Sequence, residues 1–318
     1  MIHSKKILSF EIIFVSYLVL RILFSFRSFL LLSWLLPTAP VLAVEFELQL
    51  GLASDSAAAL EELVPNASNA TGRDDIVGSL ELNATHQVNE NISVGADAMT
   101  EHYSSFDENN STSLGVNGQL SYDMDTLSLS VDGHVMSITL DGDDFLDLTM
   151  VTPALGYLND AGLYASLSAT GMNKGFKTMP DFDADQLSVS AMGIFFFNNF
   201  KSNVMLRLSD AEEDAGNNIY DYEESTYSLS TTLPLDVGPR GSRLKLTYEN
   251  RDRNYIKAVD AGQKTNEARD RGRIILDTSL TKHLTLRSEY DYKDRKSNLP
   301  QATYDSSELS LKLIYRQD

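Results

Sequence analysis

Apolar and polar residues alternate one by one along most of this chain. From Ile76 to Ala84, and again from Ile92 to Ala98, every second residue is apolar or small, on either side of the short segment Asn89-Glu90-Asn91. Successive side chains of a β-strand point to opposite faces, so this pattern predicts a hairpin with one apolar and one polar face. The same unit recurs to the C-terminus, and no apolar repeat of helical length follows residue 63.

The alternation predicts fourteen strands after residue 43. They are Val44–Leu52, the two arms of Ile76–Tyr103, Thr112–Tyr122, Thr126–Ser137, Phe145–Leu158, Leu163–Met172, Gln186–Phe197, Asn203–Ser209, Ser225–Leu235, Ser242–Arg251, Arg271–Thr281, Leu284–Tyr292 and Ser306–Arg316. Aromatic residues gather at the predicted strand ends, which is typical of rings at a membrane–water boundary. They are Tyr103, Tyr122, Tyr157, Phe197, Phe200, Tyr227, Tyr248, Tyr290, Tyr292 and Tyr315.

Long polar loops alternate with tight turns between these strands. The long connections are 53–74, 104–111, 173–185, 210–224, 252–270 and 293–305, with 140–144 as a short member of the set. Long loops at one end, short turns at the other and an even strand count predict an all-β, closed antiparallel transmembrane barrel. Strands of about ten residues span an apolar band at a tilt, and the sheet must close because lipid cannot pair its edges. A soluble β-sandwich or β-solenoid is the alternative, and its loop lengths need not alternate.

Residues 1–43 differ in kind from the rest. Lys5 and Lys6 precede apolar runs, and Val41-Leu42-Ala43 supplies small residues before a cut, so the segment is predicted to be a signal peptide cleaved after Ala43. The length of this segment would also be explained by a translation start assigned upstream of the true one, or by a membrane anchor within residues 7–36. Glu11 inside the first run disfavours the anchor. The predicted domains are therefore 1–43, a signal peptide, and 44–318, the barrel.

Composition excludes several classes of protein. The chain has 318 residues and no cysteine, so it has neither a disulfide framework nor a thiolate metal site. The first 43 residues carry a net charge of +3 within a total of −19, so the remainder carries −22. Such an acidic body lacks the basic footprint that nucleic-acid binding requires.

The pattern of residues 44–318 resembles Gram-negative outer-membrane porin-like β-barrels. The similarity rests on the alternating strands, on Tyr290-Asp291-Tyr292 and on a last strand with Leu309, Leu311, Leu313 and Tyr315, like the C-terminal signal offered to the barrel assembly machinery. Such barrels usually end on Phe or Trp, whereas Arg316-Gln317-Asp318 follow here. A weaker likeness is to the barrel of surface lipoprotein assembly modifiers, which also carry a helical repeat domain that this chain lacks. The resemblance implies a bacterial outer-membrane location, with lipid and lipopolysaccharide as surroundings.

If the apolar faces meet lipid, the polar faces line the lumen. The charged candidates are acidic in the first five strands and mainly basic in the later ones: Glu45, Glu81, Asp97, Glu101 and Asp132, then Arg207, Arg243, Lys245, Arg273, Arg287 and Lys312. Facing walls of opposite charge would bias passage by charge. The alternative is that these residues are merely polar and pair across neighbouring strands.

We expect no enzymatic activity, cofactor or metal site. No phosphate loop, dinucleotide fingerprint or zinc motif occurs, and His134 near Asp132, Ser128 and Ser130 does not make a specific catalytic set. The sequence predicts a channel for passive diffusion of small solutes or ions. The alternatives are an export conduit for polysaccharide or surface lipoprotein with a periplasmic partner, an outer-membrane hydrolase, and a structural or adhesive barrel with a filled lumen.

Overall fold

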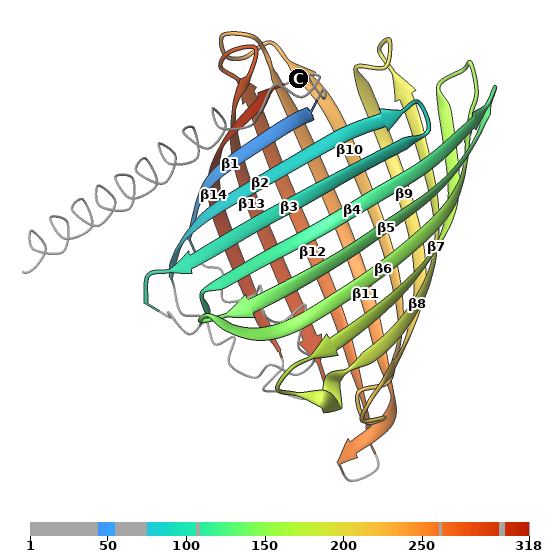
Figure 1. Ribbon diagram of the computed structural model, residues 1–318, viewed down its shortest axis with the longest axis vertical. Helices are drawn as coiled ribbons and strands as arrows, with labels where there is room; N and C mark the ends of the chain where they lie inside the picture. The colour runs from blue at the N-terminus through green and yellow to red at the C-terminus, as the bar shows by residue number, and fades with distance from the viewer. Residues whose placement is uncertain (1–43, 55–74, 106–108, 261–262, 299–302, 318) are drawn as a thin grey trace, which may run out of the picture. The chain divides into compact units, whose positions relative to one another are not determined.

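Fourteen antiparallel strands form one closed sheet (Figure 1). The computed structural model describes residues 44–54, 75–105, 109–260, 263–298 and 303–317, and the predicted signal peptide lies outside them. The strands are β1 (Val44–Ser54), β2 (Ile76–Asn89), β3 (Ile92–Tyr103), β4 (Ser111–Met124), β5 (Leu127–Leu140), β6 (Asp143–Leu158), β7 (Leu163–Phe176), β8 (Ala184–Phe197), β9 (Ser202–Ala215), β10 (Tyr222–Leu235), β11 (Ser242–Asp260), β12 (Gln263–Ser279), β13 (Leu284–Ser297) and β14 (Tyr304–Gln317).

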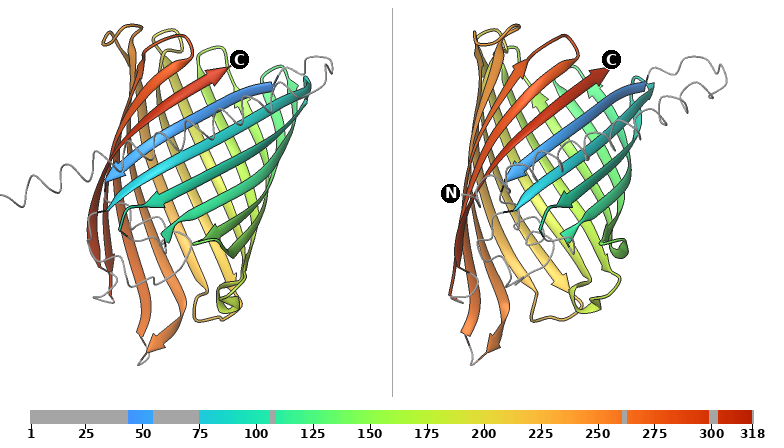
Figure 2. Two further views of the ribbon diagram at one scale, coloured as in Figure 1. Left: turned by 60° about the vertical axis from the view of Figure 1, so that its left-hand side comes forward. Right: turned by 90° about the vertical axis from the view of Figure 1, so that its left-hand side faces the viewer.

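The barrel closes where its first strand meets its last. β1 pairs with β14 from Phe46–Gln317 to Ser54–Leu309 and with β2 on its other edge. Figure 2 shows β1, in blue, beside β14, in red. Each strand pairs with its neighbours in sequence, so every edge in the sheet has a partner and the predicted fourteen-strand closed barrel is confirmed. Among the described residues, no helix is long and apolar enough to cross a bilayer.

The two faces of the sheet differ sharply in chemistry. On one face the apolar side chains are open to the surroundings: Leu114 is 61% exposed, Leu206 48% and Leu311 51%. Most of the alternate residues are polar, and they are more enclosed, as the inside of a closed barrel requires. An exposed apolar band that runs round all strands would be unstable in water and is satisfied by hydrocarbon.

Aromatic rings border this band. Tyr122, Tyr157, Phe197, Phe200 and Tyr315 lie toward the ends where the chain makes its short turns, and Tyr227, Tyr248, Tyr290 and Tyr292 lie toward the other end; each is at least 37% exposed. This arrangement fits amphipathic rings at the two membrane boundaries. Tyr103 was predicted among them, and that prediction is wrong. It pairs with Val77 on the inward register and is only 4% exposed.

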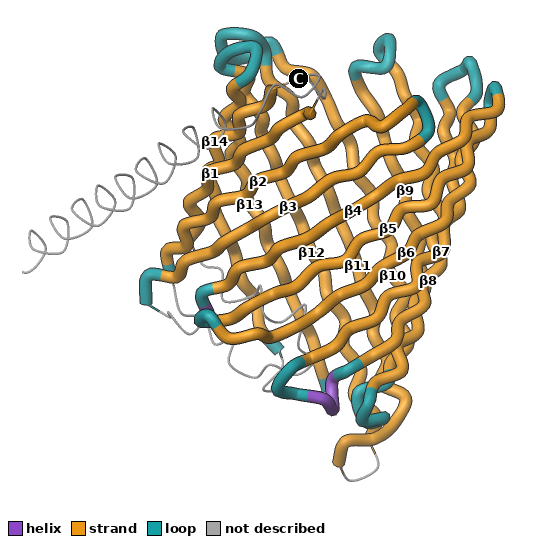
Figure 3. Tube along the Cα trace, viewed as in Figure 1, coloured by secondary structure: helices purple, strands orange, loops and turns teal. Residues whose placement is uncertain are grey.

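Several strands run further than their apolar pattern indicates. The predicted loops 210–224, 252–270 and 293–305 are largely strand, because β9, β11, β12 and β13 continue beyond the apolar band. The β11–β12 hairpin extends past the neighbouring loops (Figure 3). Beyond the band both faces meet water or polar groups, so hydrophobic alternation stops while backbone pairing continues. The acidic segment Asp210–Asp214 is therefore part of β9 and not of a loop.

The short connection on the loop side has a clear cause. Asp141 and Gly142 both have positive φ, 49° and 85°, between β5 and β6. Two successive residues of positive φ are typical of a type I′ hairpin turn, for which Asp-Gly is a favoured pair. We call the end of the barrel that carries this turn and the longer connections the loop end, and the other end the turn end.

The assignment of an outward, lipid-facing side and an inward side to each strand is tested by placing an arginine at either of two adjacent positions. Leu206→Arg should lower the free energy of unfolding in lipid vesicles by about 2–4 kcal/mol, the cost of an arginine at the bilayer midplane. Met205→Arg, its neighbour on the inward register, should cost far less. Equilibrium urea unfolding measures both, and equal losses would contradict the assignment.

Candidate functional site

The candidate site is the inward face of the barrel. The strand register places all the charged candidates on the face opposite the exposed apolar band: Glu45, Glu81, Asp97, Glu101 and Asp132, and Arg207, Arg243, Lys245, Arg273, Arg287 and Lys312. The alternation of strand side chains produces this shared direction. It gathers residues that are up to 267 positions apart in sequence onto one inner surface.

The wall from β1 to β6 is acidic. Between Arg73 and Lys174 the chain contains neither lysine nor arginine, so no strand from β2 to β6 has a permanent cation. Glu81 accepts a hydrogen bond of 2.8 Å from Asn83 Nδ2, and Glu101 accepts one of 3.4 Å from Ser111 Oγ. These carboxylates thus accept hydrogen bonds from neutral polar neighbours, and the strands β2 to β6 offer them no lysine or arginine.

One histidine breaks the pattern of this wall. His134 Nε2 on β5 lies 3.1 Å from Asp97 Oδ1 on β3, across the intervening strand β4. A Cβ at Gly115 on β4 would lie 2.5 Å from both Asp97 Oδ2 and His134 Nε2, so only glycine leaves room for this pair. The sequence analysis grouped His134 with neighbours on its own strand and missed Asp97. The sequence signal that could have indicated this pair is Gly115, a residue without a side chain on the polar register between them.

The opposite wall carries a network of ion pairs on β10 to β13. Glu224 accepts from Arg253, with 2.7 Å between Nη2 and Oε2, and also lies 3.6 Å from Arg251 Nε. Asp291 accepts two hydrogen bonds from Arg271 Nε, at 3.0 and 2.9 Å. Arginine suits such sites because its planar fork meets a carboxylate in two places.

Two of the basic candidates belong to this network. Arg287 binds Asp277 through two parallel contacts, 2.7 Å from Nε and 2.9 Å from Nη2. Arg273 lies 3.1 Å from Glu289 Oε1 and 3.3 Å from Asp291 Oδ2. Their charge is compensated locally, as the alternative reading of the sequence expected for individual residues.

The other four basic candidates are not compensated in this way. Within the described residues, Arg207, Arg243, Lys245 and Lys312 make no ion pair with a carboxylate. Arg243 and Lys245 lie on β11 near its turn end, Arg207 lies on β9 and Lys312 on β14. Cations without a close ion pair among the described residues on β9, β11 and β14 therefore share the inward register with the carboxylates of β1 to β5.

Charges of opposite sign thus lie on different parts of the inward register. Fixed charges in an enclosed space with low-dielectric walls concentrate field lines and bias the local concentration of small ions. Among the described residues, no three carboxylate, imidazole or thiol groups converge closely enough to hold a metal ion. The interior is thus a polar surface of two signs.

No family model and no curated protein sequence matches this chain. Solved structures do match its fold. In-vitro folded OmpT, an outer-membrane protein of Vibrio cholerae, aligns with a TM-score of 0.50 at 10% identity over 86% of this chain and 96% of its own. The anion-selective porin from Comamonas acidovorans aligns with a TM-score of 0.43 at 12% identity, over 86% of this chain and 99% of its own. Acinetobacter baumannii OccAB3 aligns with a TM-score of 0.44 at 10% identity, over 86% of this chain and 98% of its own.

The fold is that of a bacterial outer-membrane porin-like barrel. At such low identity the likeness concerns the architecture alone. The predicted resemblance to outer-membrane porin-like barrels is therefore confirmed for the fold. The charged residues of the inner face have to be judged on their own geometry.

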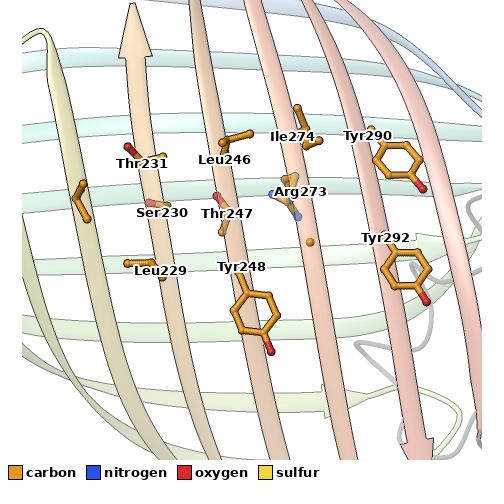
Figure 4. Close-up of a pocket in the computed structure, with 12 residues that line it drawn as sticks. Leu229, Ser230, Thr231, Leu246, Thr247, Tyr248, Arg273, Ile274, Tyr290 and Tyr292 are labelled. Atoms are coloured by element: carbon orange, nitrogen blue, oxygen red, sulfur yellow. The ribbon is translucent and has the colours of Figure 1, made fainter.

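The porin-like barrel also has a hollow on its outer face, toward lipid (Figure 4). The hollow has a volume of about 680 Å³ and is lined chiefly by outward-facing apolar and aromatic side chains, among them Leu229, Tyr248, Ile274, Tyr290 and Tyr292. It exists because Gly272 contributes no side chain: a Cβ there would meet no atom within 4 Å. This hollow is separate from the charged inner face and is not part of the candidate site.

Gly272→Ala should stabilise the barrel. Replacing glycine within a strand removes conformational freedom from the unfolded chain, an effect of about 0.5–1 kcal/mol where no clash follows. Urea unfolding in vesicles measures the change, and Gly115→Ala serves as the matched comparison because its Cβ would clash with the Asp97–His134 pair. A loss of stability in Gly272→Ala would contradict the position assigned to this residue.

Proposed function

We propose that this porin-like barrel is a conduit for the passive diffusion of small solutes or ions across the outer membrane, and that the charge of its inner face biases what passes. The proposal includes no bond-breaking chemistry. Outer-membrane lipid and lipopolysaccharide would surround the apolar band, and the barrel assembly machinery would insert the chain. A periplasmic partner belongs to the export alternative.

One observation carries the proposal: charged and polar side chains gather on the inward register, while the band on the outward register is apolar. A barrel whose only task was to anchor in lipid would need no such interior. The carboxylates of β1 to β5 and the cations of β9, β11 and β14 supply opposite signs on different parts of the wall. A solute that crosses would meet both, as at charged rings in known channels.

A structural or adhesive barrel is the second candidate, and one observation favours it. Several large inward side chains near the loop end are inaccessible, including Leu146 at 0% and Tyr222 at 2% exposure. An interior filled by side chains supports a rigid wall without transport. Electrical conductance separates the two candidates, because only a conduit produces current steps in a planar bilayer.

The charge reversal Arg243→Glu with Lys245→Glu tests the conduit. Both residues lack an ion-pair partner among the described carboxylates, so the change alters lumen charge without orphaning a buried partner. The purified barrel should give discrete conductance steps, and the double variant should shift the reversal potential in a salt gradient toward cation preference. The reversal potential is the measured quantity.

Two controls sharpen this test. Lys282→Glu makes the same type of charge change in the turn between β12 and β13, outside the barrel wall, and should leave the reversal potential nearly unchanged. Arg287→Gln removes a cation already compensated by Asp277 and should affect stability more than selectivity. Unchanged ion preference in the double variant would sink the role assigned to lumen charge, and a complete absence of current would favour the structural barrel.

A further inference from the structure

Large inaccessible side chains are concentrated at one end of the barrel. Val77, Tyr103, Leu146, Phe176, Tyr222 and Tyr255 all lie on the inward register, each within six residues of the loop end of its strand. Their exposures run from 0% for Leu146 to 5% for Phe176. They come from β2, β3, β6, β7, β10 and β11, which lie around most of the circumference. We call these six residues, together with Phe145, Arg253 and the side chains that pack against them, the loop-end ring.

The turn end is different. Inward positions there, such as Ser130, Asp132 and Gln119, are half-buried or exposed. Ile275 and Ile314 are the large buried side chains on that side. Inward side chains are therefore more accessible toward the turns than toward the loops, where the large ones pack against side chains of neighbouring strands.

One half of the ring is apolar and tied to the loops. Phe145 and Phe176 meet edge to face with ring centroids 5.5 Å apart, and Phe176 lies 6.1 Å from Phe182 in the short 3₁₀ helix η3 (Pro180–Phe182). Phe182 stacks on Tyr220 at 4.3 Å, which joins the connection 177–183 to the connection 216–221. These contacts pack aromatic groups of β6, β7 and the two connections together in preferred geometries at the loop end.

The other half is a polar network. Tyr222 Oη donates to Glu213 Oε2 at 2.7 Å, and Lys174 Nζ lies 2.5 Å from the same oxygen. The Arg253 guanidinium lies 3.9 Å from the centre of the Tyr222 ring, and Tyr255 packs against that ring at 5.9 Å. Beyond it, Arg295 Nη2 pairs with Glu267 Oε1 at 2.6 Å, with both residues buried.

The rim beside β2 is fixed by a buried carboxylate outside the strands. Asp75 accepts hydrogen bonds from the backbone nitrogens of Ile76 and Ser105 and from Ser104 Oγ. Burial alone would raise the pKa of Asp75, but these hydrogen bonds outweigh it and hold the pKa of the carboxyl below its usual value. The carboxylate therefore stays ionised and keeps the start of β2 against the end of β3.

We infer that the loop-end ring, and not the charged wall nearer the turns, is the section that limits passage through this barrel. The packed arrangement is the closed state of the conduit, and a solute passes only when the ring side chains separate. The inference rests on the proposed conduit function. Passage is then limited by the bulky side chains of the ring, whereas the sequence analysis expected the charge of the lumen to control it.

The first experiment measures transit. The double variants Tyr222→Ala with Arg253→Ala, and Phe145→Ala with Phe176→Ala, open the polar and the apolar half separately, so failure of one to fold leaves the other. Each should raise the flux of a small neutral sugar through proteoliposomes by about tenfold or more, which corresponds to a barrier about 1.4 kcal/mol lower. Tyr227→Ala is the matched control: it removes a tyrosine from the same strand β10, but from the outer face.

The second experiment measures access and uses the absence of native cysteine. Ser130→Cys lies on the open part of the inner face, and Thr265→Cys replaces a β12 residue that is 2% exposed at the loop end. In detergent-solubilised protein a polar thiol reagent should modify Ser130→Cys rapidly and Thr265→Cys slowly. Either ring variant should accelerate the reaction at Thr265→Cys.

The outcomes separate this inference from the conduit function. If wild-type flux already equals that of the ring variants, or Thr265→Cys reacts as fast as Ser130→Cys in the native ring, the inference is overturned while the conduit stands. If the ring variants expose Thr265→Cys yet neither they nor the wild type carries sugar or current, closure by the ring stands and the conduit function fails. Faster transit in both ring variants but not in Tyr227→Ala supports both.

Discussion

The structure depends on one constraint: backbone polar groups inside hydrocarbon must find their hydrogen-bond partners within the protein. An unpaired N–H or C=O in lipid costs several kcal/mol, so a spanning sheet has to close. The pairing of β1 with β14 satisfies this requirement for the first and last strands. Closure then determines where the side chains point, because it gives each strand one face toward lipid and one toward the interior.

The interior shows how this barrel holds many charges close together. Arginines on β11 to β13 share carboxylates with their neighbours, so the positive charge of this wall is largely compensated where side chains are least accessible. Breaking such a pair by removing one partner leaves a poorly solvated charge, which is costly. The cations without a close ion pair lie elsewhere on the wall and face more open space. The ion-paired and the unpaired basic residues therefore lie in different surroundings, although all of them share one register.

Much of the fold follows from the sequence because a period of two is unambiguous. The alternation at Leu309, Leu311 and Leu313 in the last strand sufficed to predict a strand with one lipid face. Strand ends were predicted poorly wherever the chain leaves the apolar band. Asp252-Arg253-Asn254 carry no hydrophobic signal, yet they remain paired with β12 as part of β11, since backbone hydrogen bonding does not depend on side-chain polarity.

The inner face was predictable only as a set. Register alone placed Arg243 and Arg287 on it. Asp277 lies opposite both of them across strand pairs, yet only Arg287 forms an ion pair with it, and no local pattern in the sequence shows that choice. The Asp97–His134 contact joins strands that are not adjacent, so no local pattern contains it. Tyr103 shows the reverse case: an aromatic residue at a strand end has the same local signature whether it borders lipid or fills the interior.

Closure of the sheet is tested most directly by linking its two ends covalently. Leu52 on β1 and Leu311 on β14 lie opposite each other on the outer face, and the chain has no native cysteine to interfere. In the folded protein, Leu52→Cys with Leu311→Cys should be joined within one molecule by a short membrane-permeable bis-thiol reagent, seen as a mobility shift on denaturing electrophoresis. Leu52→Cys with Leu229→Cys on β10 should not be joined. Absence of the first link, or equal linking of both pairs, would contradict a closed barrel.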